Sequence, residues 1–183
     1  MIANNAPKIP RTNRNLIVNI NGRLVHRDEA GISPFDSVVQ GGDAVWEGLR
    51  LYSGRIFRLN EHLDRLRSSA LALAFTQIPS HAEIIEQISR TLKANQMIDG
   101  VHIRLTLTRG VKITSGMDPR LNQAGPTLIV LAEHKPPVYD KAGLSLVTSS
   151  VQPLSARLPR PQNSPQQSDS IDPGQDRSEC RRS

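Results

Sequence analysis

Short apolar runs and strict alternation of apolar and polar residues mark several segments of the chain as β-strands. The expected strands are 15–20, 23–26, 44–52, 55–59, 101–108, 127–132 and 144–148. Asn21-Gly22 and Ser53-Gly54 are tight-turn dipeptides, and each lies between two neighbouring strand segments. The pattern therefore predicts an antiparallel sheet that contains hairpins.

The apolar spacing becomes helical between Leu59 and Asn95. The first helix follows an N-cap at Asn60 and runs to Phe75, with an apolar stripe of Leu59, Leu63, Leu66, Ala70 and Leu73. The second helix follows an N-cap at Ser80, with a stripe of Ile84, Ile85, Ile88 and Leu92. Strands, two helices and again strands predict an α+β domain, in which an antiparallel sheet carries both helices on one face.

Composition sets the boundaries of this domain at residues 15–151, where apolar and polar residues are mixed throughout. Residues 1–14 are polar and basic, and are predicted to form a flexible arm. Residues 152–183 are mainly Gln, Ser, Pro, Asp and Arg. So few apolar side chains cannot offset the entropy cost of ordering, and this tail is predicted to be disordered.

Charge and composition also exclude several functions. The net charge is +6, but the basic residues are spread out and aromatic residues make up only 3%, so nucleic-acid binding is not expected. Cys180 is the single cysteine and the five histidines lack metal-ligand spacing, so no metal site is expected. No apolar run reaches membrane length, which predicts a soluble cytoplasmic protein; the basic, acid-free segment Met1–Arg14 leaves organelle targeting open.

Arg65 is the first candidate for chemistry. It lies beside the apolar stripe of the first helix, where a guanidinium emerges between core and solvent and can bind a phosphate with two hydrogen bonds. The alternative is an ordinary solvated arginine, paired with Asp64 or Glu61.

Arg104 and Trp46 are the second and third candidates. The segment 101–108 places His102, Arg104, Thr106 and Thr108 on one face of a strand. Such a row either lines a polar pocket, with Arg104 available for a substrate carboxylate, or is the solvated face of a sheet. Trp46 stands in a glycine-flanked segment and is either a wall of a ligand site or a core residue.

The order of the motifs along the chain is more specific than any one of them. They are Asn21-Gly22, Gly42-Asp-Ala-Val-Trp-Glu-Gly-Leu-Arg50, His62-Leu-Asp-Arg-Leu66, Ile103-Arg104, Thr108-Arg-Gly110 and Ser115-Gly-Met117. In this order they resemble the small N-terminal domain of the class IV aminotransferases. The resemblance is greatest to the branched-chain enzymes, whose relatives include D-amino-acid transaminases and aminodeoxychorismate lyases.

The resemblance implies a homodimeric enzyme that holds pyridoxal 5'-phosphate between a small and a large domain and transfers an amino group from an amino acid to 2-oxoglutarate. It assigns the cofactor phosphate to Arg65, the substrate side to Arg104, and a wall of the substrate pocket to Trp46. One departure concerns Gly41, which stands where branched-chain enzymes have a pocket tyrosine. That departure leaves the substrate class open.

A larger departure follows Val151. The family continues there toward the lysine that bonds covalently to the cofactor, whereas this chain has no lysine from Ala142 to Ser183, so no catalytic residue is assigned. Shifting the reading frame by one base, with permitted codons, turns Pro159-Arg-Pro-Gln-Asn163 into Leu-Asp-Pro-Lys-Ile. We interpret the tail as frameshifted sequence; an unbroken reading frame in the transcript and in intact relatives would contradict this.

Three hypotheses for function follow. The first is a truncated aminotransferase that does not turn over alone. The second is an enzyme in which Lys112 or Lys141 replaces the family lysine, and borohydride trapping of a cofactor–lysine adduct would support it. The third is a non-catalytic module that pairs with an intact protomer, which co-purification would detect.

Overall fold

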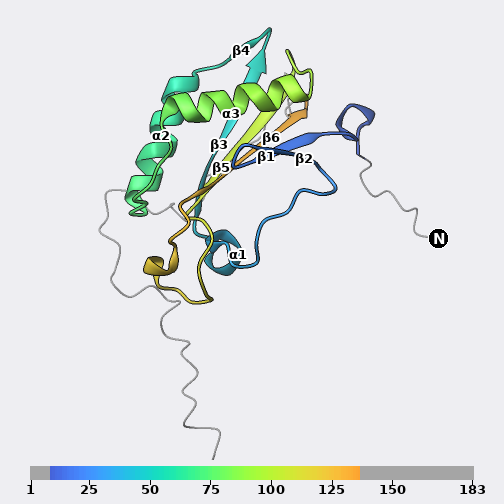
Figure 1. Ribbon diagram of the computed structural model, residues 1–183. Helices are drawn as coiled ribbons and strands as arrows, with labels where there is room; N and C mark the ends of the chain where they lie inside the picture. The colour runs from blue at the N-terminus through green and yellow to red at the C-terminus, as the bar shows by residue number, and fades with distance from the viewer. Residues whose placement is uncertain (1–8, 137–183) are drawn as a thin grey trace, which may run out of the picture. The chain divides into compact units, whose positions relative to one another are not determined.

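Six strands form an antiparallel sheet in the order β2-β1-β6-β5-β3-β4. The computed structural model describes residues 9–136 (Figure 1). The strands are β1 (Ile17–Ile20), β2 (Arg23–His26), β3 (Ala44–Tyr52), β4 (Arg55–Ile56), β5 (Val101–Thr108) and β6 (Thr127–His134). The expected α+β fold with an antiparallel sheet is confirmed, while the expected strand 144–148 and tail 152–183 lie outside the described residues.

The helices are α1 (Ser37–Gly41), α2 (Leu59–Ala72) and α3 (His81–Ala94). Short 3-10 turns, η1 (Arg11–Asn13) and η2 (Pro119–Leu121), complete the elements. The expected start of α3 is confirmed, because Ser80 and Glu83 form a reciprocal capping box. The sequence patterns do not predict α1; it begins after Asp36, whose side chain caps it, and ends at Gly42 in the left-handed conformation.

The start and end of α2 differ from the prediction. Its N-cap is Arg58 rather than Asn60, and Arg58 has a left-handed backbone with φ 48°. That conformation turns the chain directly from β4 into the helix, so the strand expected over 55–59 ends at Ile56. The helix ends at Ala72 instead of Phe75, because Ala74 is also left-handed, with φ 56°.

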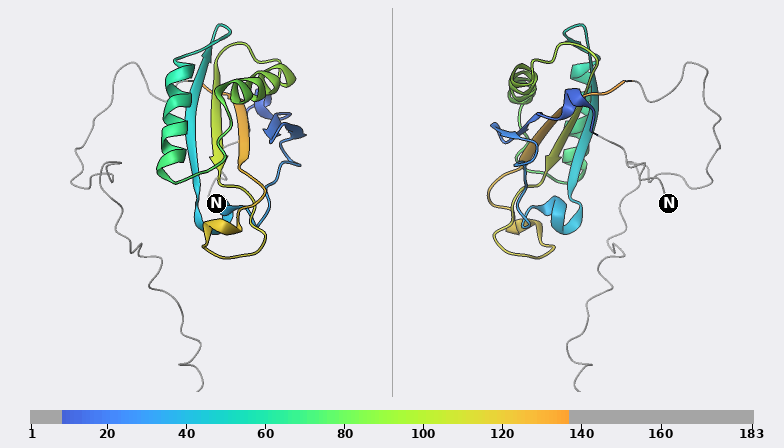
Figure 2. Two further views of the ribbon diagram at one scale, coloured as in Figure 1. Left: turned by 60° about the vertical axis from the view of Figure 1, so that its left-hand side comes forward. Right: turned by 90° about the vertical axis from the view of Figure 1, so that its right-hand side faces the viewer.

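Both long helices cover the same face of the sheet. Helix α2 contacts β3, and α3 contacts β1 and β6; Figure 2 shows α3 nearly end-on beside the sheet. The side chain of Asn19 in β1 fixes α3, because its amide donates to the Gln87 carbonyl oxygen at 3.2 Å. The opposite face has no long helix over it among the described residues, and we call it the open face.

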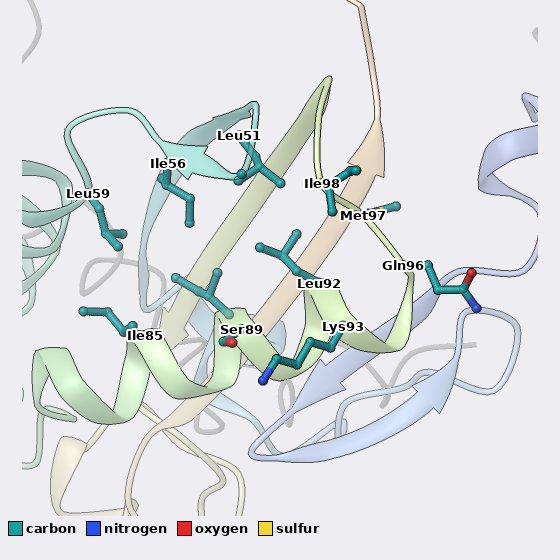
Figure 3. Close-up of a pocket in the computed structure, with 12 residues that line it drawn as sticks. Leu51, Ile56, Leu59, Ile85, Ser89, Leu92, Lys93, Gln96, Met97 and Ile98 are labelled. Carbon is teal, nitrogen blue, oxygen red and sulfur yellow. The ribbon is translucent and has the colours of Figure 1, made fainter.

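The covered face is incompletely filled at the β4 edge of the sheet. A pocket of about 430 Å³ opens there between β4 and α3, lined by apolar side chains such as Ile56, Ile85 and Leu92 (Figure 3). Lys93 contributes the charged group of its lining. None of the candidate residues Trp46, Arg65 or Arg104 lines this pocket.

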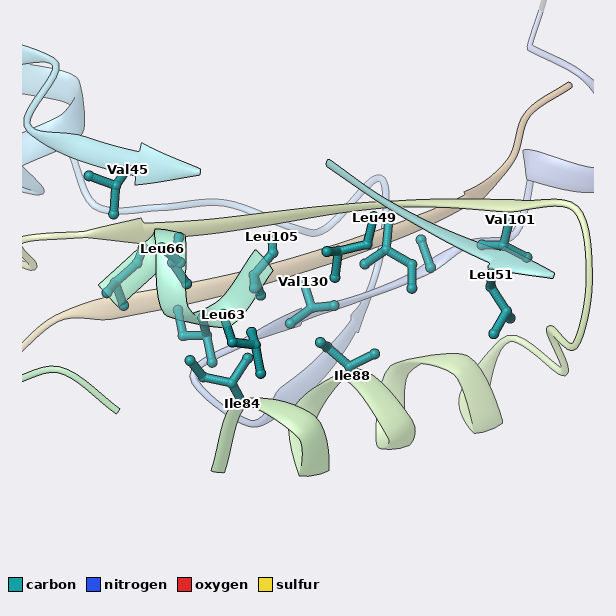
Figure 4. Packing of buried hydrophobic residues seen from close by; sticks show 14 of the residues in the cluster. Val45, Leu49, Leu51, Leu63, Leu66, Ile84, Ile88, Val101, Leu105 and Val130 are labelled. Atoms are coloured by element: carbon teal, nitrogen blue, oxygen red, sulfur yellow. The ribbon is translucent and has the colours of Figure 1, made fainter. Parts of the chain in front are cut away.

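Away from this edge, the side chains between the sheet and the two helices are fully buried. Alternate residues of the central strands meet the stripes of the two helices, and the largest fully buried side chains are Leu49, Leu63, Leu66, Ile84, Ile88, Ile103, Leu105 and Leu107 (Figure 4). Removing one such side chain to Ala costs about 2–5 kcal/mol in a packed core. This core fixes β3 and α2 against each other, and the candidate site is built from both.

A buried carboxylate joins the α1 segment to the ends of two strands. Asp36 is fully buried, and its side chain accepts hydrogen bonds from the Thr108 hydroxyl at 3.0 Å and the Thr127 hydroxyl at 2.8 Å. Its other oxygen accepts from the backbone N–H of Val38 at 3.0 Å. Asp36 therefore anchors the loop before β3 to β5 and β6.

Replacing Asp36 with Ala should lower the free energy of unfolding by about 2–4 kcal/mol, because a helix cap is lost and buried hydroxyls lose their acceptor. Urea unfolding followed by circular dichroism would measure this loss. Asp118→Ala is the matched control, since Asp118 also caps a helical turn but in an exposed position, and its effect should be clearly smaller. Equal losses in both variants would show that the buried hydrogen bonds at Asp36 contribute nothing beyond capping.

Candidate functional site

Strand β3 separates two groups of functional side chains. Trp46 lies on the open face and is 56% exposed, whereas the next residue, Glu47, lies on the covered face and is 3% exposed. Successive side chains of a strand point to opposite faces, so this division follows from the strand itself. Trp46 is therefore not a core residue.

On the open face, Arg104 stacks on Trp46. Register places Arg104 of β5 directly opposite Gly48, two positions along the strand from Thr106, which is opposite Trp46. Because Gly48 has no side chain, Arg104 can reach across it, and its guanidinium carbon lies 3.4 Å from the centre of the Trp46 ring. This is the geometry of a cation–π contact.

The open face carries basic side chains of β3 and β5 beside this pair, while Leu131 of β6 lies opposite Arg104 in the register. His102 and Arg50 are opposite each other in the register, and Arg50 donates to the Lys135 carbonyl oxygen at 2.5 Å. Burial lowers the pKa of His102, and the charges of Arg50 and Lys135 lower it further, so His102 is neutral at pH 7. The row of polar side chains expected from His102 to Thr108 is not exposed along its whole length. Thr108, at its end, is buried and donates a hydrogen bond to Asp36.

On the covered face, Glu47 binds two residues of α2. The Arg65 Nε donates to one carboxylate oxygen at 2.6 Å, and the Arg65 Nη2 donates to the other. His62 Nδ1 lies 2.8 Å from that second oxygen. His62 and Arg65 are three residues apart, so they lie on one side of the helix and reach the same carboxylate.

These contacts shift the ionisation of both partners. Burial alone would raise the pKa of Glu47, but the hydrogen bonds and charges of Arg65 and His62 outweigh it and leave the pKa below its ordinary value. The hydrogen bond to Glu47 raises the pKa of Arg65. The carboxylate and the guanidinium are therefore both charged at neutral pH, and the pair is a salt bridge.

The alternative partners considered for Arg65 are wrong. The Asp64 carboxylate lies 3.6 Å from His81 Nε2, and the Glu61 carboxylate lies 3.9 Å from Arg58 Nε. Arg65 pairs with Glu47 instead. The side chain of Arg65 is 66% exposed, so its pairing leaves much of the guanidinium accessible. Arg65 lies on the covered side of β3, and it does not join Trp46 and Arg104 on the open face.

Loops pack closely at the end of the sheet that α1 occupies. A Cβ atom on Gly41 would lie 3.2 Å from Met117 Cε, so the Ser115–Met117 loop lies against the position of the expected pocket tyrosine. Gly110 has φ 103°, and a Cβ there would lie 1.8 Å from the Gly125 carbonyl oxygen, so glycine is required.

Sequence reasoning missed the role of Glu47 and of His62. A signal existed in the i, i+3 spacing of His62 and Arg65, which indicates a shared partner, but it does not identify that partner. Only the packing of α2 against β3 brings Glu47 to them.

Within residues 9–136, no helix is long and apolar enough to cross a membrane, and no group of three or more metal-ligating side chains forms.

Comparison with known proteins assigns the family. The family model for Amino-transferase class IV matches residues 44–163, a segment that contains Trp46, Glu47, Arg65 and Arg104. The chain belongs to the class IV aminotransferases. This confirms the resemblance seen in the motifs, and the family is dependent on pyridoxal 5'-phosphate.

Relatives within the class IV aminotransferases include branched-chain and D-alanine enzymes. Branched-chain-amino-acid aminotransferase-like protein 2 of Arabidopsis thaliana is 57% identical over 146 residues, which is 79% of this chain and 26% of that protein. The putative branched-chain-amino-acid aminotransferase of Methanocaldococcus jannaschii is 37% identical, covering 78% and 48%. The D-alanine aminotransferase of Bacillus licheniformis is 32% identical, covering 70% and 45%. The chain thus spans between a quarter and a half of these relatives.

Solved structures of class IV aminotransferases share the fold. The T.th. branched-chain amino acid aminotransferase, complexed with N-(5'-phosphopyridoxyl)-L-glutamate, superimposes with a TM-score of 0.56 at 27% identity. The match covers 64% of this chain and 40% of that one. The Escherichia coli enzyme gives the same TM-score at 24% identity, which supports the fold alone.

The Trp46–Arg104 contact predicts a change in fluorescence. Trp46 is the single tryptophan, so its emission reports on the surroundings of this one ring. Replacing Arg104 with Gln should shift the emission to longer wavelength and increase quenching by acrylamide, because the ring loses its cover and a contact of about 0.5–1 kcal/mol. Arg58→Gln, which removes a guanidinium 5.8 Å from Phe57, is the control and should change neither. Unchanged emission in Arg104→Gln would contradict the contact.

Proposed function

We propose that this chain forms the small-domain wall of a cleft in which a pyridoxal-phosphate-dependent aminotransferase binds its cofactor and an amino acid. Arg65 holds the cofactor phosphate, Arg104 receives a substrate carboxylate, and Trp46 forms a side of the substrate pocket. The chain does not turn over substrate alone, and its partner in the intact family is a second copy.

One observation carries this proposal: consecutive residues of β3 hold the two arginines on opposite sides of one strand. Trp46 contacts Arg104 on the open face, and Glu47 binds Arg65 on the covered face. Both guanidiniums are thereby fixed relative to one rigid strand, one on each side of it. An arginine left to a loop would lose more conformational freedom on binding.

The residues fit the cofactor chemically. A guanidinium that stays charged at any physiological pH and is 66% exposed suits a phosphate dianion. When bound, the cofactor supplies the electron sink for amino-group transfer. The residues of this chain bind and orient: Arg65 fixes the phosphate end, and Arg104 together with Trp46 orients the amino acid.

Branched-chain or related amino acids and 2-oxo acids are the proposed substrates. The support is the degree of similarity, which is 57% identity to a branched-chain-like relative against 32% to a D-alanine enzyme. Gly41 and the neighbouring Met117 give this chain its own arrangement where branched-chain enzymes have a pocket tyrosine, so the proposal extends to related amino acids.

Absence of turnover rests on the lysines. From Ala142 onward the sequence has none, and Lys112 is only 6% exposed, with its amine donating to the Gly116 carbonyl oxygen at 2.5 Å. A buried amine held in this way is a poor replacement for a catalytic lysine. Lys141 lies outside the described residues.

The test compares pyridoxine phosphate with pyridoxine, two ligands without an aldehyde that differ only in the phosphate. The wild-type chain should bind the phosphate ester more tightly, and Arg65→Ala should reduce that advantage by about fivefold, as expected for one exposed ion pair. Equilibrium dialysis measures both affinities. Arg67→Ala, which removes a charge from another exposed position of α2, is the control and should have little effect.

Covalent chemistry is tested with pyridoxal phosphate and borohydride. We expect no stoichiometric lysine adduct by mass spectrometry and no transfer from leucine to 2-oxoglutarate. A single modified lysine with turnover would overturn the inactive assignment, and an Arg65→Ala chain with unchanged preference for the phosphate ester would overturn the phosphate assignment.

A further inference from the structure

Glu47 is a buried carboxylate whose two oxygens are both committed to α2. One oxygen accepts from Arg65 Nε, and the other accepts from Arg65 Nη2 and faces His62 Nδ1 at 2.8 Å. A charged carboxylate can only accept hydrogen bonds, so Nδ1 of His62 carries the proton of this contact. The carboxylate is therefore held from two positions on one helix, one turn apart.

This pairing decides which edge of the Arg65 guanidinium is available. A carboxylate that engages Nε and Nη2 occupies one side of the planar group. The opposite edge carries Nη1, which has no hydrogen-bond partner within residues 9–136, whereas Nη2 also lies 3.3 Å from His62 Nδ1. Because the guanidinium is planar, fixing one edge also fixes the direction of the other.

We infer that Glu47 is a positioning residue, which turns the Nη1 edge of Arg65 outward to receive the cofactor phosphate, with His62 holding Glu47 in place. The inference rests on the proposed function of Arg65 as the phosphate-binding residue. Glu47 itself does not touch the phosphate.

The charge of Glu47 and its positioning role predict opposite changes in phosphate affinity when that charge is removed, which makes the inference testable. A carboxylate beside a phosphate site repels the phosphate, so removing its charge should tighten binding if Glu47 only contributes to the local field. If Glu47 positions Arg65, removing its charge should weaken binding, because the long side chain of Arg65 then samples several conformations. The sign of the change separates the two explanations.

The experiment measures the affinity ratio of pyridoxine phosphate to pyridoxine for the Glu47→Gln chain. We expect the ratio to fall by about twofold to fourfold, less than the loss in Arg65→Ala. Glu61→Gln is the matched control, since it removes the same charge from an exposed position of α2 that contacts Arg58 instead. The ratio for Glu61→Gln should stay constant or rise slightly.

A double variant tests whether Glu47 acts through Arg65. In the Arg65→Ala background, Glu47→Gln should cause no further loss, because the residue that it positions is already absent. If Glu47→Gln fails to fold, as judged by circular dichroism, Glu47→Asp keeps the charge but withdraws it by one methylene and should show a smaller loss of the same sign.

The outcomes distinguish this inference from the proposed function. A ratio that falls in Arg65→Ala but stays constant or rises in folded Glu47→Gln overturns the positioning role and leaves the phosphate assignment intact. A ratio that is unchanged in Arg65→Ala overturns the phosphate assignment, and the positioning role with it. A loss in Glu47→Gln that persists in the Arg65→Ala background shows that Glu47 acts by another route and contradicts the inference.

Discussion

The salt bridge between Glu47 and Arg65 connects the fold to the proposed site. It joins the middle of β3 to the middle of α2, and it lies at the margin of the core that Leu63 and Leu66 close. A carboxylate this deeply buried is stable as an ion only when its oxygens are satisfied, and Arg65 and His62 together satisfy them. The same contacts that allow Glu47 to be buried thus give an exposed arginine a fixed direction.

Strand alternation extends this constraint to the open face. Because Glu47 must face the helix, Trp46 and Gly48 on either side of it must face away, and Gly48 gives Arg104 access to the Trp46 ring. A shift of one residue in the register of β3 would exchange these faces and bury Trp46 in place of Glu47. Asp36 opposes such a shift, since it ties the segment before β3 to Thr108 and Thr127.

Much of the fold was predictable from periodicity, because strand alternation and helix stripes are local properties. The strands around Asn21-Gly22 and the capping box at Ser80 are examples. Left-handed residues such as Arg58, which set the start of α2, carry no comparable signal for a non-glycine residue. For the site, sequence could nominate Arg65, but its partner Glu47 is 18 residues away and meets it only through tertiary packing. The motifs nevertheless identified the family, because their order along the chain is more specific than any single residue or contact.

The central claim is that an arginine oriented by a buried carboxylate receives the cofactor phosphate. A crystal structure of this chain grown with saturating pyridoxine phosphate tests it most directly. We expect the phosphate at Nη1 of Arg65, with the Nε and Nη2 hydrogen bonds to Glu47 retained. A phosphate bound instead at Arg104, or an Arg65 that leaves Glu47 to bind it, would contradict the account.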